Sequence, residues 1–169
     1  MTPGFAELDP ENATSQEVMT AVEEQLQQLN DLITEDLPEL DHDALNRANE
    51  LFIAALEAKT PKARRRRARE ALGVCPECAD AWLLLSRELD LSPPERLIYI
   101  ERAIDAGRVV IGEDFGNMIG AFWGFHETRP YMRAMEARAR FNYESGILEE
   151  AIEIWEAMLN LNPNDNQGV

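Results

Sequence analysis

Apolar residues recur at intervals of three and four along most of the chain, which is the spacing of one face of an α-helix. The first such segment follows Thr14 and Glu17, a pair that forms a capping box at a helix start. Its apolar positions are Val18, Val22, Leu26, Leu29, Leu32 and Ile33. Leu37-Pro38 ends this pattern, and either Asp41 or Asp43 can cap a second helix.

Caps, prolines and glycines place five further helices. Thr60 with Pro61 starts one of them, Ser92 opens another with a capping box, and Thr128 is expected to cap the helix before Gly146. The expected spans are about 61–73, 79–89, 92–111 and 129–143, with a last helix from about 147. Because we find no convincing run of alternating strand residues, the sequence predicts an all-α fold with antiparallel neighbouring helices.

Two segments have the spacing of a known helical repeat. EALGVCPECADAWLLLSREL and GILEEAIEIWEAMLNLNP resemble parts of tetratricopeptide (TPR) repeats. The positions that carry this resemblance are Ala71, Leu72, Pro76, Trp82 and Leu85 in the first segment, and Gly146, Ala151, Trp155, Leu159 and Pro163 in the second. Residues 92–106 resemble another second helix in a shortened repeat, whereas residues 112–128 fit no such repeat.

A longer combination of motifs points to a narrower group. PECADAWLLL, FWGFHETRPYMRA and EEAIEIWEAMLNLNPNDNQGV are similar to bacterial TPR-like proteins related to the suppression of tumorigenicity seven family. The resemblance implies a right-handed stack of antiparallel helix pairs, a TPR-like α-solenoid, that acts as a scaffold and has no established catalytic residues. We therefore expect a mobile tail at 1–12, a helical N-terminal extension at 13–60 and a TPR-like region at 61–169.

The repeat register predicts which side chains line the concave groove and bind a protein or peptide partner. These residues are Arg133, Glu136, Arg140 and Tyr143 in the last repeat, and Asp80, Leu83 and Arg87 in the earlier one. The arginines could hold a peptide carboxylate in bidentate fashion, and Tyr143 could supply apolar area. In the alternative interpretation, the arginines form ion pairs with Glu127, Glu136 or Glu144.

Charge along the chain is strongly uneven. The protein has a formal net charge of −16, which disfavours general binding to nucleic acid or anionic membranes. The tract PKARRRRARE is the exception, and on a helix Lys62, Arg65, Arg66 and Arg69 share one face. One interpretation is a solvated helix that neutralises carboxylates of the first 60 residues. The alternative function is an anion-binding or nucleic-acid-binding regulator that uses this face.

Signatures of enzymes and metal sites are weak. Phosphate-binding, zinc-protease and nucleophile-elbow motifs are all missing from the sequence, so we predict a non-enzyme without catalytic residues or cofactors. An enzyme that uses His126 and Glu127 would need a pocket joining them to other polar groups. Cys75 and Cys78 supply at best half of a four-ligand zinc site, and we interpret both as structural.

The remaining expectations concern the aromatic residues, the last helix and the location. Most of Trp82, Phe122, Trp123, Phe125, Tyr131 and Trp155 are expected in the core. The last helix of a stack needs cover, so Trp155 or Met158 is expected to pack against a second copy, giving a homo-oligomer, or against the N-terminal helix. The chain has no apolar run near 20 residues and no secretory signal, which predicts a cytoplasmic protein without membrane contact.

Overall fold

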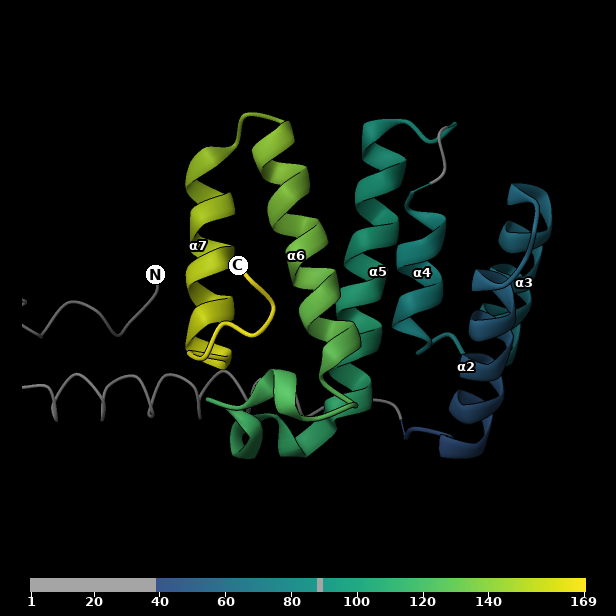
Figure 1. Ribbon diagram of the computed structural model, residues 1–169, viewed down its shortest axis with the longest axis horizontal. Coiled ribbons are helices and arrows are strands. Elements are labelled where there is room, and N and C mark those ends of the chain that lie inside the picture. Colours follow the sequence, from purple (N-terminus) through teal and green to yellow (C-terminus); the bar gives the residue numbers. More distant parts are fainter. Residues whose placement is uncertain (1–38, 88–89) are drawn as a thin grey trace, which may run out of the picture.

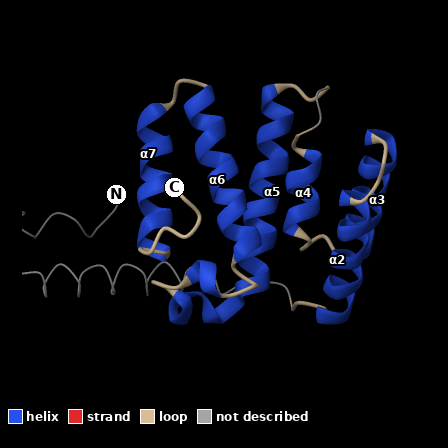
Figure 2. Cartoon of the chain, in the orientation of Figure 1, coloured by secondary structure: helices blue, strands red, loops and turns tan. Residues whose placement is uncertain are grey.

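The computed structural model describes residues 39–87 and 90–169. Regular structure in these residues consists of helices alone, as Figure 2 shows, and this confirms the all-α prediction for this part of the chain. The α-helices are α2 (His42–Leu56), α3 (Pro61–Val74), α4 (Ala79–Leu85), α5 (Pro93–Ile111), α6 (Arg129–Glu144) and α7 (Leu148–Leu161). Two 3-10 helices, η1 (Gly112–Met118) and η2 (Phe122–Gly124), connect α5 to α6. The predicted tail at 1–12 and the helix after Thr14 lie outside the described residues.

Local capping groups set three of the helix starts as expected. The Asp41 carboxylate accepts a hydrogen bond from the Ala44 amide at 2.9 Å, and the Thr60 hydroxyl accepts one from the Ala63 amide at 3.2 Å. Ser92 forms its capping box with Glu95, whose carboxylate accepts from the Ser92 amide at 2.9 Å. Each cap satisfies an amide that the first helical turn leaves without a partner.

Thr128 corrects one of these predictions. It occupies the position before α6, but its hydroxyl makes no capping bond to the helix. Instead the hydroxyl donates to the carbonyl oxygens of Phe122 and, at 3.1 Å, of Phe125. Because Thr128 is fully buried, its single proton serves the carbonyls of η2, and the side chain holds η2 against the start of α6.

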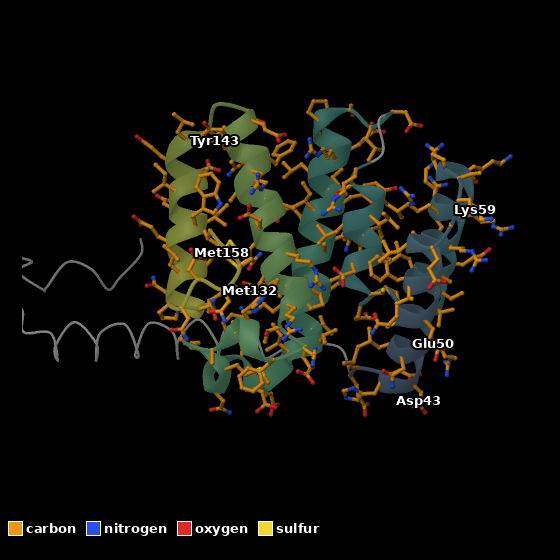
Figure 3. The ribbon with its side chains drawn as sticks, viewed as in Figure 1. Asp43, Glu50, Lys59, Met132, Tyr143 and Met158 are labelled. Atoms are coloured by element: carbon orange, nitrogen blue, oxygen red, sulfur yellow. The ribbon has the colours of Figure 1, made fainter. Side chains whose placement is uncertain are left out.

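The helices pack in sequence-adjacent pairs that lie in a row, with α3 at one end and α7 at the other (Figure 1). Helices α2, α4 and α6 run in one direction, and α3, α5 and α7 run back. In Figure 3, Asp43 and Lys59 mark the lower and upper ends of the α2 region, and Met132 and Tyr143 mark those of α6. Since α2 packs on α3, the expected boundary at residue 60 falls inside a helix pair.

Small side chains fill most of the helix contacts. The cluster between α2, α3 and α4 contains Ala44, Ala48, Ala68, Ala71, Cys75, Cys78, Ala81 and Leu85. A second cluster, between α4, α5 and α6, contains Ala79, Leu83, Ala103, Ala106 and Ala134. Alanine contributes little volume, so the helix backbones come close together and the larger apolar residues of these helices are pushed to the edges of the contacts.

Aromatic residues fill the third cluster, beneath α6 and α7. The ring of Phe115 packs edge-on against Phe122 at 4.8 Å and against Tyr131 at 5.6 Å between centroids, a favoured aromatic geometry. The core prediction is confirmed for Phe122 and Tyr131, while the three tryptophans are partly buried. It is wrong for Phe125, which is 40% exposed where the chain turns from η2 towards α6.

A buried polar group ties the last three helices together. The Arg138 guanidinium donates to Glu101 on α5 and to the amide oxygen of Asn142 on its own helix. Asn142 is fully buried, and its amide nitrogen donates to Glu150 on α7 at 3.1 Å. These bonds supply the partners that a buried amide needs, and they fix α5, α6 and α7 relative to one another.

The two cysteines are free thiols buried between α2, α3 and α4. The Cys75 thiol donates to Glu77 at 3.1 Å, and the Cys78 thiol donates to the amide oxygen of Asn49 at 3.5 Å. Burial raises the pKa of Cys75 to about 11 and that of Cys78 to about 12. In the described part of the chain, no group of three or more His, Cys, Asp or Glu residues could hold a metal ion. None of the described helices is long and apolar enough to cross a membrane.

We predict that the thiols make the protein sensitive to alkali. A thiol ionises near pH 8.5 in an unfolded chain, whereas the raised pKa values keep both thiols protonated in the folded state. Their contribution to stability is therefore complete below about pH 8.5 and is lost as the pH rises towards 11 and 12. The free energy of unfolding in urea should fall less between about pH 9 and pH 11 in Cys75→Ala/Cys78→Ala than in the wild type. Equal slopes would contradict this account.

A second prediction concerns Gly107, where α5 meets α6 backbone to backbone. A Cβ atom at this buried position would lie 2.9 Å from both Cα and Cβ of Tyr131, inside van der Waals contact. Gly107→Ala should lower the free energy of unfolding by about 1–3 kcal/mol in urea, although alanine is the better helix former.

Gly73→Ala is the matched control for Gly107→Ala. Gly73 also lies in a helix, and a Cβ atom there meets no other atom within 4 Å. This variant should raise the free energy of unfolding by up to about 1 kcal/mol. If both variants changed stability in the same direction, the close contact with Tyr131 would not be the cause.

Candidate binding face

Helices α2, α4 and α6 present one continuous side of the row, which we call the three-helix face. Its residues follow each other at helical intervals of three and four, so they share one side of each helix. They are His42, Asn46, Asn49, Ile53 and Leu56 of α2; Glu77, Asp80, Leu84 and Arg87 of α4 and its flanks; and Arg133, Glu136, Arg140 and Tyr143 of α6. Two cavities lie along this face, one at each end of the cleft between α2 and α4.

The first cavity lies where α2, α4 and α6 begin, and we call it the histidine cavity. It has a volume of about 310 Å³ and is lined by both histidines of the chain. Its polar lining consists of His42, Asn46, Asn49, Glu77, Asp80, His126 and Glu127. The pocket that would join His126 and Glu127 to other polar groups therefore exists.

The second cavity lies between the ends of α2 and α4 and the start of α3, and we call it the arginine cavity. Its volume is about 950 Å³. Leu56, Pro61, Arg64, Arg65, Leu84, Arg87 and Asp90 line it. Arg65 pairs with Asp90 at 3.3 Å, whereas Arg64 and Arg87 are exposed and make no ion pair or side-chain hydrogen bond within the described residues. Two guanidinium groups thus lie beside apolar surface without a partner of their own.

The predicted groove residues of α6 are mostly engaged inside the protein. Arg133 binds the Asp80 carboxylate with two hydrogen bonds, Nε to Oδ1 at 2.9 Å and Nη2 to Oδ2 at 2.6 Å, and so joins α6 to α4. Arg140 pairs with Glu136, which confirms the alternative interpretation for that arginine. Glu136 also accepts a hydrogen bond from the Trp155 indole at 3.0 Å.

Two other predicted groove residues have different surroundings from those of Arg133. Tyr143 is 59% exposed, and its ring lies 5.9 Å from that of Trp155 between centroids. Leu83 is a correction, because it is only 3% exposed and packs in the alanine-rich cluster against α5 and α6. Leu84, the next residue, takes its place on the three-helix face, and Arg87 lies in the arginine cavity.

Sequence reasoning missed the contribution of α2 to this face. Ile53 and Leu56 are 55% and 54% exposed, and Leu56 lines the arginine cavity. They were missed because the repeat region was expected to begin only at residue 61. The spacing of Asn49, Ile53 and Leu56 was visible in the sequence, but it separates one side of the helix and does not reveal which side is buried.

The arginine tract forms a surface of its own on α3. Lys62, Arg65, Arg66 and Arg69 do share one side of the helix, where with Glu70 they line a depression of about 610 Å³. Arg66 pairs with Glu70 at 3.5 Å and Arg65 with Asp90 at 3.3 Å. These carboxylates lie beyond the first 60 residues, so the described ion pairs differ from the predicted ones; residues 1–38 lie outside the described part.

The outer side of α7 differs from the expectation for the end of the stack. Met158 is completely buried against the protein's own core, so it cannot cover a second copy, and Trp155 is partly buried. The large apolar side chains that α7 leaves open are instead Leu148, Ile152 and Leu159, exposed by 52%, 52% and 39%.

The three-helix face thus combines a polar cavity, an apolar centre and a cationic cavity within one cleft. Its acidic and basic ends are separated along α4, where Asp80 and Arg87 lie about 10 Å apart at the rise of an α-helix. No protein-family model matches the chain, and no curated protein or solved structure matches it either.

Proposed function

We propose that the protein is a non-enzymatic helical scaffold that binds a protein or peptide partner along the three-helix face. The observation that carries this proposal is the arginine cavity, where Arg64 and Arg87 lack partners in the described residues and stand beside exposed Leu56. Arginine and large apolar side chains are enriched where proteins bind each other, because they offer both directed hydrogen bonds and area to bury.

The apolar residues of α2 add a physical reason for a partner. Ile53 and Leu56 are one helical turn apart, and each exposes more than half of its surface to water. Covering apolar surface is favourable by roughly 25 cal/mol per Å². A segment that lies in the cleft would cover these side chains and place its own carboxylates against Arg64 and Arg87.

A TPR-like solenoid is the finer fold that we propose for this scaffold. In this reading α4–α5 and α6–α7 are successive repeats, preceded by the pair α2–α3. Support comes from the common direction of α2, α4 and α6 (Figure 1) and from the contact of α4 with α6. In a right-handed stack the first helices of the pairs line the concave side, which corresponds to the three-helix face.

The histidine cavity does not favour an enzyme over a scaffold. Among the described residues that line it, none is a serine, threonine, cysteine, tyrosine or lysine, so it offers none of these nucleophiles. His126 and Glu127 are both exposed. A reaction there would have to rely on general acid–base catalysis alone, whereas binding of a polar side chain needs nothing further.

The first test reverses the two arginines of the arginine cavity. In Arg64→Glu/Arg87→Glu, captured partners should be lost from an affinity experiment in the native organism, because carboxylates of the partner would meet carboxylates of the face. The matched control is Arg47→Glu/Arg102→Glu, which reverses two exposed arginines of α2 and α5 outside both cavities. Circular dichroism should show the same helicity for both. Identical partners with both variants would refute the proposal.

Arg133 and Arg140 are less informative targets for such a test. Each is held by a carboxylate of the protein, Asp80 and Glu136 respectively. Reversing them would break these pairs and disturb the contact between α4 and α6, so a loss of binding would have two explanations.

A second candidate function is supported by the depression on α3. Its four basic residues form one surface, as an anion-binding or nucleic-acid-binding regulator would require. We expect no binding of a single-stranded RNA oligonucleotide in fluorescence anisotropy at physiological salt, because the net charge of −16 opposes it. Binding that weakens steeply with salt and disappears in Lys62→Ala/Arg66→Ala would favour this candidate over the scaffold.

A further inference from the structure

We propose that the histidine cavity binds the cationic side chain, lysine or arginine, of the partner that lies on the three-helix face. The inference rests on the proposed function and names the chemistry of one end of the bound segment. It follows from the charges, the shape and the hydrogen-bonding groups of the cavity.

The charge of the cavity favours a cation. Three carboxylates line it, those of Glu77, Asp80 and Glu127, and its border carries one guanidinium, that of Arg133. With neutral imidazoles these groups sum to 1 − 3 = −2. The bidentate bond to Asp80 holds the Arg133 guanidinium, so this cation is not free to neutralise Glu77 and Glu127. A cation from outside is therefore attracted to the cavity.

Shape and donors select a side chain rather than a bare ion. At about 310 Å³, the cavity has the size of a small ligand site. Leu45, Val110 and Pro130 give it apolar walls that suit the methylene groups of a lysine or arginine. The amide oxygens of Asn46 and Asn49 and the carboxylates provide acceptors for the several N–H donors of an ammonium or guanidinium group.

Helix ends oppose this preference only in part. The first turns of α2, α4 and α6 border the cavity, and the partial positive charge of a helix N-terminus attracts anions. Asp41 already bonds the Ala44 amide of α2, and Asp80 lies in the first turn of α4. Whole negative charges of carboxylates exceed the partial charges of helix ends, so the cation is still preferred.

Protonation of the histidines should weaken the site. The charged and titratable groups that face it are His42 from α2, Glu77 and Asp80 beside α4, and His126, Glu127 and Arg133 at α6, while α5 contributes only uncharged Val110. Histidine is the side chain that ordinarily changes charge between pH 5 and pH 8. Two added protons would bring the sum from −2 to 0 and remove the attraction for a cation.

The experiment follows two probes by NMR in the isotope-labelled full chain. N-acetyl-lysine-amide carries the cation, and N-acetyl-norleucine-amide has a similar chain without the ammonium group. At pH 8 the lysine probe should produce saturable shifts of amides around the cavity and bind at least about 10-fold more tightly than the norleucine probe. At pH 5.5 its binding should weaken. Equal binding of both probes, or no saturable shifts at millimolar lysine probe, would overturn the proposal.

Matched variants assign the effect to the cavity. Glu127→Gln removes an exposed carboxylate of the lining and should weaken the lysine probe about 2- to 5-fold. Glu113→Gln removes an exposed carboxylate of η1 outside the cavity and should leave the affinity unchanged. Equal affinity of Glu127→Gln and wild type would overturn the assignment.

The two proposals fail in distinguishable ways. If the lysine probe does not bind but partner capture depends on Arg64 and Arg87, the cation site is wrong and the scaffold function stands. If the lysine probe binds as expected but capture does not depend on these arginines, the cavity is a cation site and the proposed function is wrong.

Discussion

The close approach of helices through small side chains is the constraint on which the other features of this protein depend. Alanines fill the contacts of α2 with α3 and α4, and those of α4 with α5 and α6, while Gly107 lets α5 touch α6 at the backbone. Such contacts have little room for larger residues, because protein interiors are close-packed. Ile53 and Leu56 therefore remain exposed on the three-helix face instead of entering the core.

The same packing gives the face its electrical asymmetry. Because α2, α4 and α6 run in one direction, residues near their starts gather at one end and residues near their ends at the other. The Arg133–Asp80 pair binds α6 to α4 near the acidic end and neutralises one carboxylate there. What remains is a cleft with Glu77 and Glu127 at one end and Arg64 and Arg87 at the other, a pattern that would fix the direction of a bound segment.

Several groups of the sequence took roles that local patterns did not reveal. Thr128 has the sequence position of a helix cap, yet its buried hydroxyl serves the carbonyls of η2. Leu83 and Leu84 are neighbours of the same type, and packing against α5 decided that Leu83 is buried and Leu84 lines the cleft. Arg133 found Asp80 on another helix, while Arg140 paired with Glu136 one turn away, as local spacing allows.

The amino-acid sequence by itself determined the helical class and most helix limits. Caps such as Asp41 and Thr60 act on amides within three residues, so the chemistry that starts a helix is contained in a short stretch of chain. The tertiary structure decided the candidate site. His42 and His126 share a cavity only because α2 and α6 flank α4, and this depends on how whole helices pack. Periodicity gives the side of a helix on which a residue lies, but not what that side meets.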